Sequence, residues 1–340
     1  MTSSMTSLER VLAVLQGKEP DYIPLFPLLN EHAAGLLGMD ELEYHRNPTR
    51  LAEGQMALVK KFNHDFLLAF TYLAREVTAV GVKTVFQEGM APVTGKPIVE
   101  KASEVANLDL PDFYNHPETS VVLDQIKQLA ELSDGQYPII GVATGPFSLP
   151  TLLMGNDHWL MSLFMEENAD VKAAMRYTNQ FSAEWAKAQL EAGAHGIAIV
   201  EGSATKSIIP EDVFVDLVKP SLTQLTAAIG GVKVLVGVGG EWEPFLGHIQ
   251  ETGFGGVILS TNDDLKRSLS KTKDMIMFGN INNLEFMDYT DEDIEQTVKN
   301  TLEDGAGGRF VLATQYVLPV GVTHDQIHAF VRYGRQYGKQ

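Results

Sequence analysis

Residues 138–143 read PIIGVA and residues 196–200 read GIAIV, two short apolar runs rich in β-branched side chains. Neither run alternates strictly between polar and apolar residues, which is typical of parallel strands buried on both faces. A segment with approximate helical spacing of apolar residues, residues 170–190, lies between them. This part of the chain therefore predicts a strand, a helix and a second strand of an α/β fold.

Further runs of the same kind occur on both sides. In chain order, the eight predicted strands are residues 22–28 (YIPLFPL), 65–70 (DFLLAF), 138–143, 196–200, 232–238 (VKVLVGV), 256–260 (GVILS), 275–278 (MIMF) and 309–313 (RFVLA). Helical segments separate them, and no stretch resembles a linker. We therefore predict one closed (β/α)8 TIM barrel over residues 1–340, preceded by an N-terminal helical segment. A doubly wound open sheet has the same local pattern and remains the alternative. Residues 82–99 interrupt the alternation and are expected to form a hairpin excursion.

Several helix starts are visible. Thr6 and Glu9 form the S/T-x-x-E pattern of a capping box, and Thr290 with Asp293 is a similar start. Pro210 suits the first turn of a helix after Ile209. These signals place helices between the predicted strands.

The charge balance limits the possible partners. The chain has 26 Lys and Arg residues against 44 Asp and Glu residues, a formal net charge of −18. Such an acidic surface repels phosphate groups, so nucleic acids and anionic membranes are disfavoured as partners.

Cysteine is absent, which excludes disulfides, thiolate nucleophiles and sulfur-ligated zinc. The N-terminal residues lack the apolar run of a secretory signal. The best candidate for a membrane span, residues 137–156, contains Pro138, Pro146 and Pro150, which would interrupt a spanning helix. We therefore expect a soluble, cytoplasmic protein.

In a TIM barrel, catalytic groups lie where strands end. This rule selects a set rich in carboxylates and amides, in chain order Asn30, Glu31, His32, Tyr72, Glu201, Glu241, Glu243, Asn262, Asn280, Asn282, Gln315 and Tyr316. His248 is a further candidate, although a histidine inside a helical segment is more often a surface or core residue.

Structural roles remain open for these residues. Glu201 directly follows GIAIV, so its carboxylate points to the barrel mouth or pairs with a helix N-terminus. Residues 30–32 could instead cap the helix that begins near Ala33. Glu241 and Glu243 could favour the start of the next helix through its dipole.

The sequence gives no support for the common motifs of nucleotide-binding proteins, hydrolases and metalloproteases. Gly237-x-Gly239-Gly240 lacks the third glycine and the later acidic residue of a dinucleotide loop, so we reject a Rossmann site. The sequence contains no Walker loop, HExxH, GxSxG or CxxC motif.

A series of segments resembles the uroporphyrinogen decarboxylase superfamily. In chain order they are Ser7-Leu8-Glu9-Arg10, residues 18–24 (KEPDYIP), residues 107–112 (NLDLPD), residues 145–149 (GPFSL), residues 278–283 (FGNINN) and residues 308–313 (GRFVLA). The series covers nearly the whole chain with compatible spacing. The resemblance implies a (β/α)8 barrel.

The decarboxylase residues of that superfamily are missing. Its arginine-rich segment after the first strand corresponds to residues 26–35 (FPLLNEHAAG), which contain no arginine. By the resemblance, the aspartate that contacts the pyrroles falls at Tyr72, the expected tyrosine at Leu153 and the expected histidine near Gln315. A polycarboxylate substrate also needs cationic groups, so decarboxylation of uroporphyrinogen is not expected.

The other branch of the superfamily resembles this chain more closely. Its members are corrinoid-dependent methyltransferases, and those that methylate thiols bind zinc through a His-x-Cys pair and a further Cys. Those positions here are Gly237-x-Gly239 and Gln315 or Tyr316. The resemblance therefore implies the demethylating direction, in which a methyl ether of an aromatic, or a similar small methylated donor, passes its methyl group to the cobalt(I) of a corrinoid protein.

Site roles follow from that hypothesis. The predicted catalytic residues are Glu201, Tyr72 and His32, because a departing alkoxide needs a proton or a Lewis acid. The predicted substrate-binding residues are Asn30, Asn280, Gln315 and Tyr316. An oxygen- and nitrogen-ligated zinc is considered at Glu201, Glu241 and His248. The alternatives are a decarboxylase of a smaller acid and a barrel that binds a small ligand without catalysis.

Overall fold

The structure is a computed structural model that describes residues 5–87, 90–272 and 274–340. It confirms the eight predicted parallel strands, which form one sheet in the order β1-β10-β9-β8-β7-β6-β5-β2. The strands are β1 (Leu25–Phe26), β2 (Leu67–Ala69), β5 (Ile139–Thr144), β6 (Gly196–Val200), β7 (Val232–Val236), β8 (Gly256–Ile258), β9 (Ile276–Ile281) and β10 (Phe310–Thr314). Neighbours in the sheet follow the chain without the reversal that a doubly wound sheet requires, so the alternative fold was wrong.

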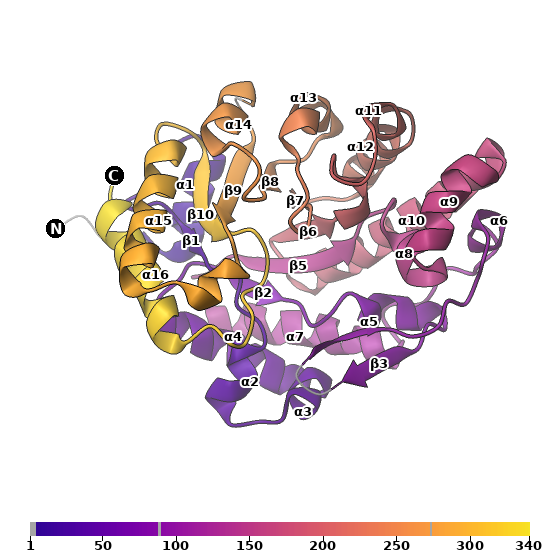
Figure 1. Ribbon diagram of the computed structural model, residues 1–340. Coiled ribbons are helices and arrows are strands. Elements are labelled where there is room, and N and C mark those ends of the chain that lie inside the picture. The colour runs from indigo at the N-terminus through magenta and orange to yellow at the C-terminus, as the bar shows by residue number, and fades with distance from the viewer. Residues whose placement is uncertain (1–4, 88–89, 273) are drawn as a thin grey trace.

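The sheet curls so that its two end strands meet (Figure 1). At this seam the backbone N–H of Asp65 donates to the carbonyl of Leu25 at 3.0 Å, and the N–H of Leu25 donates to the Asp65 carboxylate at 2.8 Å. The rings of Phe26 and Phe66 stack across it with centroids 4.4 Å apart. Among the described residues, β1 and β2 form no backbone ladder. The Asp65 carboxylate and the stacked rings of Phe26 and Phe66 join the two ends of the sheet instead.

Two arginines hold the seam carboxylate. Asp65 has no exposed surface and lies 2.6 Å from Arg10 and 2.9 Å from Arg335. These arginines belong to the first helix and the last, so the buried ion pairs attach both ends of the described chain to the seam. A buried carboxylate needs such partners because desolvation of a lone charge costs several kcal/mol, in order of magnitude.

Helices surround the strands, as Figure 1 shows. They are α1 (Ser7–Leu15), α2 (His32–Leu37), α3 (Glu41–Arg46), α4 (Pro48–Phe62), α5 (Ala74–Val77), α6 (Ala102–Val105), α7 (Pro117–Ser133), α8 (Leu149–Met154), α9 (Asn156–Met165), α10 (Asn168–Ala192), α11 (Glu211–Val213), α12 (Lys219–Ala228), α13 (Leu246–Ile249), α14 (Leu265–Lys271), α15 (Asp291–Gly305) and α16 (His324–Tyr337). The predicted capping boxes at Thr6 and Thr290 are confirmed, since both exchange hydrogen bonds with the third helical residue. Pro210 is the N-cap residue of α11.

Each strand buries both faces, which explains the unalternating sequence. In β6, Ile197 and Ile199 pack in the outer core between strands and helices. Ala198 and Val200 pack in the separate core inside the barrel, together with Phe278. The filled interior leaves binding to the ends of the strands.

The predicted excursion is a hairpin of β3 (Thr84–Gln87) and β4 (Met90–Thr94), which pair antiparallel. Residues 88–89 lie outside the described chain. In the described ranges, we find no helix with the length and apolar character needed to cross a bilayer.

Candidate active site at the carboxyl ends of the strands

A cavity of about 640 Å³ opens at the carboxyl ends of β1, β2, β9 and β10. One arm of the hairpin and α8 complete its wall. The lining residues are Glu31, Glu41, Phe70, Thr71, Tyr72, Leu73, Ala74, Pro92, Val93, Thr94, Leu152, Asn283, Leu284, Tyr316, Val317, Leu318, Pro319, Val320 and Gly321. The cavity is therefore built from loops that TIM barrels use for binding and catalysis.

The charged groups of this wall are all of one sign. Glu31 and Glu41 are its carboxylates, and none of the described lining residues is a lysine, arginine or histidine. The remaining wall is mostly aliphatic, with the aromatic rings of Phe70, Tyr72 and Tyr316. This composition favours a small ligand with apolar surface and disfavours an anion.

Glu31 is the first acidic residue after β1. Its carboxylate accepts a hydrogen bond from Nδ2 of Asn30 at 3.2 Å. Burial raises the pKa of Glu31 to about 7, and the nearby charge of Glu41 acts in the same direction. Although Glu31 is the N-cap residue of α2, its side chain makes no capping hydrogen bond. The capping role considered for it was wrong, and the carboxyl remains available to the cavity.

Two predicted site residues, Tyr72 and Tyr316, line the cavity. The Tyr72 ring lies edge-on to His45, with centroids 5.6 Å apart, and to Phe86 at 5.9 Å. Burial raises the pKa of Tyr316 to about 12, and the charge of Glu31 contributes. Burial also raises the pKa of Tyr72, so both phenols stay protonated near neutral pH.

Asn30 supports this wall without contacting the cavity. Its side chain has no exposed surface, and Nδ2 also donates to the carbonyl of Thr71 at 3.1 Å. This bond joins the loops after β1 and β2. The geometry thus gives Asn30 a positioning role for Glu31, which differs from the substrate contact predicted for it.

Glu201 ends β6 as predicted, but its carboxylate turns into the protein. The side chain has no exposed surface and accepts the backbone N–H groups of Phe147 at 2.9 Å and Ser148 at 2.8 Å. These N–H groups belong to the residues just before α8. Of the two roles expected for Glu201, it therefore has that of a partner to a helix N-terminus. Burial raises the pKa of Glu201 to about 7, against the lowering effect of those N–H groups. The Glu201 side chain has no exposed surface that a ligand could touch, which corrects the catalytic contact expected for it.

The close packing around Glu201 requires a glycine. A Cβ atom at Gly145 would overlap the Glu201 carboxylate. The Gly-Pro segment therefore lets the loop after β5 approach the end of β6.

Three more predicted residues are also absent from the cavity wall. His32 is buried, and its Nε2 lies 3.3 Å from the carbonyl of Val322; burial lowers its pKa to about 4. The Asn280 amide donates to the carbonyls of Ser260 and Asp263 at 2.8 and 2.9 Å.

Gln315 is held in a similar way. It accepts the N–H of Thr261 at 3.1 Å and donates to Asn283 Oδ1 at 3.1 Å. These bonds connect the loops after β8, β9 and β10. Because Asn283 lines the cavity, Gln315 acts on it indirectly.

The predicted zinc ligands do not converge. His248 lies in α13 with Nε2 2.9 Å from Glu211 of α11, and Glu201 is enclosed by backbone N–H groups. The backbone of Glu241 pairs with residues 206 and 207. Within residues 5–87, 90–272 and 274–340, no group of three or more His, Asp or Glu side chains could hold a metal. The residues present therefore do not fit zinc, and the predicted set Glu201, Glu241 and His248 is corrected.

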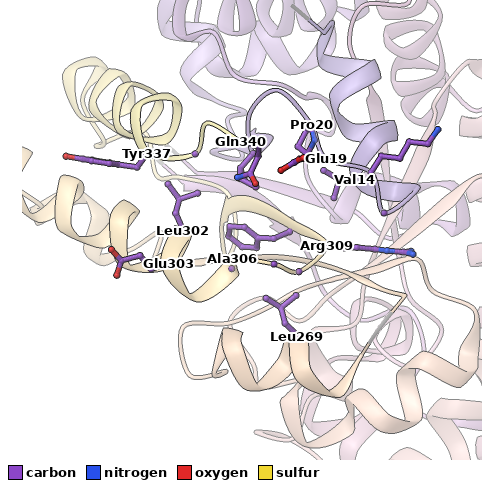
Figure 2. Close-up of a pocket in the computed structure, with 18 of the residues that line it drawn as sticks. Val14, Glu19, Pro20, Leu269, Leu302, Glu303, Ala306, Arg309, Tyr337 and Gln340 are labelled. Atoms are coloured by element: carbon purple, nitrogen blue, oxygen red, sulfur yellow. The ribbon is translucent and has the colours of Figure 1, made fainter.

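A larger hollow of about 790 Å³ lies at the opposite end of β10 (Figure 2). Its wall runs from Val14 and Glu19 near the start of the chain to Arg309, Tyr337 and Gln340. It faces the amino ends of the strands, where TIM barrels carry stability rather than catalysis. Size alone therefore does not identify the site.

Comparisons with known proteins agree with this architecture. The family model of uroporphyrinogen decarboxylase (URO-D) matches residues 6–337. The methylcobamide:CoM methyltransferase MtbA of Methanosarcina acetivorans is 28% identical over 196 residues, 57% of each chain, so the match spans little more than half of that relative. The methylcobamide:CoM methyltransferase MtaA of Methanosarcina barkeri is 26% identical over 265 residues, 75% of this chain and 76% of the relative.

A solved structure extends the likeness to the whole fold. A methyltransferase from Methanosarcina mazei superimposes with a TM-score of 0.88 at 21% identity, covering 98% of this chain and 99% of that one. At this identity the likeness concerns the fold, and it confirms the predicted barrel.

Proposed function

The chain belongs to the uroporphyrinogen decarboxylase family, and we propose that it is a methyltransferase that moves a methyl group from a small methylated donor to the cobalt(I) of a corrinoid protein. The methyltransferases MtbA and MtaA among its relatives support this class. The proposal treats residues 1–340 as one barrel domain. It includes a cytoplasmic location, which suits a chain without cysteine.

The observation that carries the proposal is the charge of the cavity. A family member that decarboxylates a polycarboxylate needs cations to bind it. Here the charged lining residues of the described chain are Glu31 and Glu41. This cavity suits a donor with apolar surface, such as a methoxylated aromatic or a methylated amine, better than an anionic acid.

We assign the donor-binding roles to cavity residues. Tyr72 and Tyr316 pack against the donor and offer O–H groups, while Glu31 places a carboxyl beside it. Asn30, His32 and Gln315 hold the loops that carry these groups. Glu201 and Asn280 hold other loops at the same end of the barrel. The corrinoid is the methyl acceptor and arrives with its partner protein, so this chain needs to expose the donor's methyl group at the mouth.

The rim of the cavity suits a protein partner. Val93, Leu284 and Val320 line the cavity and yet remain 45%, 61% and 55% exposed. Apolar side chains on an open rim are typical of protein contact surfaces. We propose that the corrinoid protein docks here, with cobalt over the cavity.

Methyl transfer to reduced cobalamin tests the proposal. Purified protein is mixed with cobalt(I) cobalamin and a panel of methyl ethers and methylated amines, and methylcobalamin is followed by absorbance. We expect at least one donor to react faster with protein than without it. Release of carbon dioxide from a small acid, with no methyl transfer from any donor, would refute the proposal and support a decarboxylase.

A further inference from the structure

The cavity wall combines half-buried carboxyl groups with aromatic rings. Its described lining residues include Glu31 and Glu41, and also Phe70, Tyr72 and Tyr316. Aromatic faces attract cations, and a carboxylate in a partly dehydrated site gains most from an opposite charge. The same wall repels an anionic donor.

We propose that the methyl donor bound in this cavity is a cation of the N-methylated ammonium class, with the Glu31 carboxylate as its counter-ion and the rings of Tyr72 and Tyr316 against its methyl groups. This inference rests on the proposed function, because it names the donor class for the same site. It distinguishes methylated amines from neutral methoxylated aromatics.

Glu31 is arranged to receive a cation. It is half-buried, and Asn30 orients it by one hydrogen bond of 3.2 Å. Although Glu41 lies close enough to raise its pKa, no ion pair of Glu31 with a basic side chain occurs in the described ranges. A cationic ligand would supply the missing charge and hold Glu31 in its ionised form.

Arg75 packs near the wall but does not occupy this role. Its guanidinium lies 4.8 Å from the Tyr72 ring centroid and donates to the carbonyl of His45 at 2.7 Å. Only 2% of the residue is exposed, and it lies outside the set that lines the cavity. Arg75 therefore braces Tyr72 from within the protein and leaves Glu31 without a cationic partner.

A cationic donor also simplifies the chemistry. The bond between nitrogen and the methyl carbon breaks, and its electron pair stays on nitrogen, which leaves as a neutral amine. The cobalt(I) corrinoid of the partner supplies both electrons of the new bond to carbon and is oxidised to cobalt(III). No proton is consumed, whereas an alkoxide leaving group requires one.

Binding of a matched pair of probes tests the inference without any turnover. Choline carries a trimethylammonium group, and 3,3-dimethylbutan-1-ol has carbon in place of nitrogen. By calorimetry near pH 8, we expect choline to bind about tenfold more tightly, in line with a buried cation–π contact and a counter-ion. Equal affinities, tighter binding of the neutral alcohol, or no binding of choline would overturn the inference.

Two single-residue variants test whether Glu31 is the counter-ion of the bound cation. Glu31→Gln, which keeps the side-chain shape, should weaken choline binding about tenfold and leave binding of the neutral alcohol unchanged, because one close charge–charge attraction is lost. The matched control Glu292→Gln removes an equal charge from the exposed first turn of α15 and should change neither affinity. An equal loss for both probes in Glu31→Gln would assign Glu31 to structure instead.

The pH dependence of the unmodified protein gives a second readout. With a pKa of about 7 for Glu31, choline affinity should rise several-fold between about pH 6 and pH 8, while that of the alcohol stays flat. Of the groups around Glu31, burial keeps Tyr44 and Tyr316 protonated and His32 neutral over this range. Glu41→Gln removes the remaining carboxylate, and the rise should persist in that variant.

Methyl transfer separates the two proposals. Transfer to cobalt(I) cobalamin from a methoxylated aromatic, but from no ammonium donor, would overturn the inference and keep the proposed function. No transfer from either class would overturn the proposed function, while the binding results still decide the charge preference of the cavity.

Discussion

Glu31 and Glu201 both follow a barrel strand, and burial raises the pKa of each to about 7. Their surroundings differ completely. Glu201 has no exposed surface and accepts two backbone N–H groups of the segment before α8. Glu31 faces a cavity of about 640 Å³ and is oriented by one amide. A shifted pKa therefore marks a buried carboxyl group, and the space beside the group separates a binding role from a structural one.

The largest effect that we expect concerns the packing around Glu201. Gly145→Ala places a Cβ atom on the Glu201 carboxylate, where neither backbone can yield easily. The free energy of unfolding, measured with urea, should fall by about 3 kcal/mol. Gly247→Ala is the control, because open space surrounds this position in α13 and the helix favours alanine. Similar stability of the two variants would contradict the tight arrangement.

Removal of the Glu201 charge should have the next largest effect. Glu201→Gln keeps one acceptor and turns an NH₂ group toward the second backbone N–H, so unfolding should become easier by about 2 kcal/mol. Methyl transfer per folded molecule should stay within about threefold of the unmodified rate. A tenfold loss of rate without a loss of stability would restore the catalytic role predicted from the sequence.

The raised pKa of Glu201 should also appear in how the free energy of unfolding responds to pH. A carboxyl group whose pKa rises from 4.5 to about 7 on folding binds protons more tightly in the folded state. Its contribution therefore lowers stability as pH rises from about 4.5 to about 7 and is constant outside this window. Glu201→Gln should flatten this decline in urea titrations. A decline of unchanged steepness would show that the N–H groups offset the burial of Glu201.

Glu31→Gln should lower the rate of methyl transfer more than it lowers stability, the opposite of what we expect for Glu201→Gln. Because the Glu31 carboxylate accepts a hydrogen bond from Asn30 and caps no helix, stability should change by less than about 1 kcal/mol. The kcat/KM of methyl transfer should fall about tenfold, a loss of about 1.4 kcal/mol of transition-state binding. Measurement of both quantities on the same preparation completes the comparison with Glu201, and a stability loss above that of Glu201→Gln would break it.

The smallest effect should come from Tyr316 in the wall of the same cavity. Tyr316→Phe keeps the ring and removes the O–H group, so KM for the donor should rise by about threefold with little change in kcat. Initial rates over a range of donor concentrations measure this. A large fall in kcat would instead give the Tyr316 hydroxyl a chemical role.

The sequence predicted the strands because each apolar run carries its own evidence of burial on both faces, as Ile197 and Ala198 illustrate in the two cores. It also placed Glu201, Tyr72 and Tyr316 at strand ends. It could not show that Glu201 meets Phe147 and Ser148, because these partners lie 54 and 53 residues away. That contact depends on the approach of two loops, which no local pattern records.

For Glu31 the sequence suggested a structural role, whereas the structure shows that it lines the cavity. Its position before α2 suggested a cap, and the preference of acidic residues for helix N-termini concealed its cavity contact. A second acidic residue ten positions later, Glu41, is the signal in the sequence that could have been used. In the structure Glu41 begins α3 and lines the same cavity as Glu31, so the two carboxyl groups lie in one site.

The hairpin between β2 and α7 has a consequence for how such barrels change their ligands. Pro92, Val93 and Thr94 form part of the cavity wall, yet in the part of the chain that the structure describes β3 and β4 pair with each other and with no strand of the barrel. Mutations in this arm can therefore alter the width and polarity of the cavity while the barrel ladder stays intact. We therefore expect ligand preference to be easier to change through this arm than through the strands of the barrel.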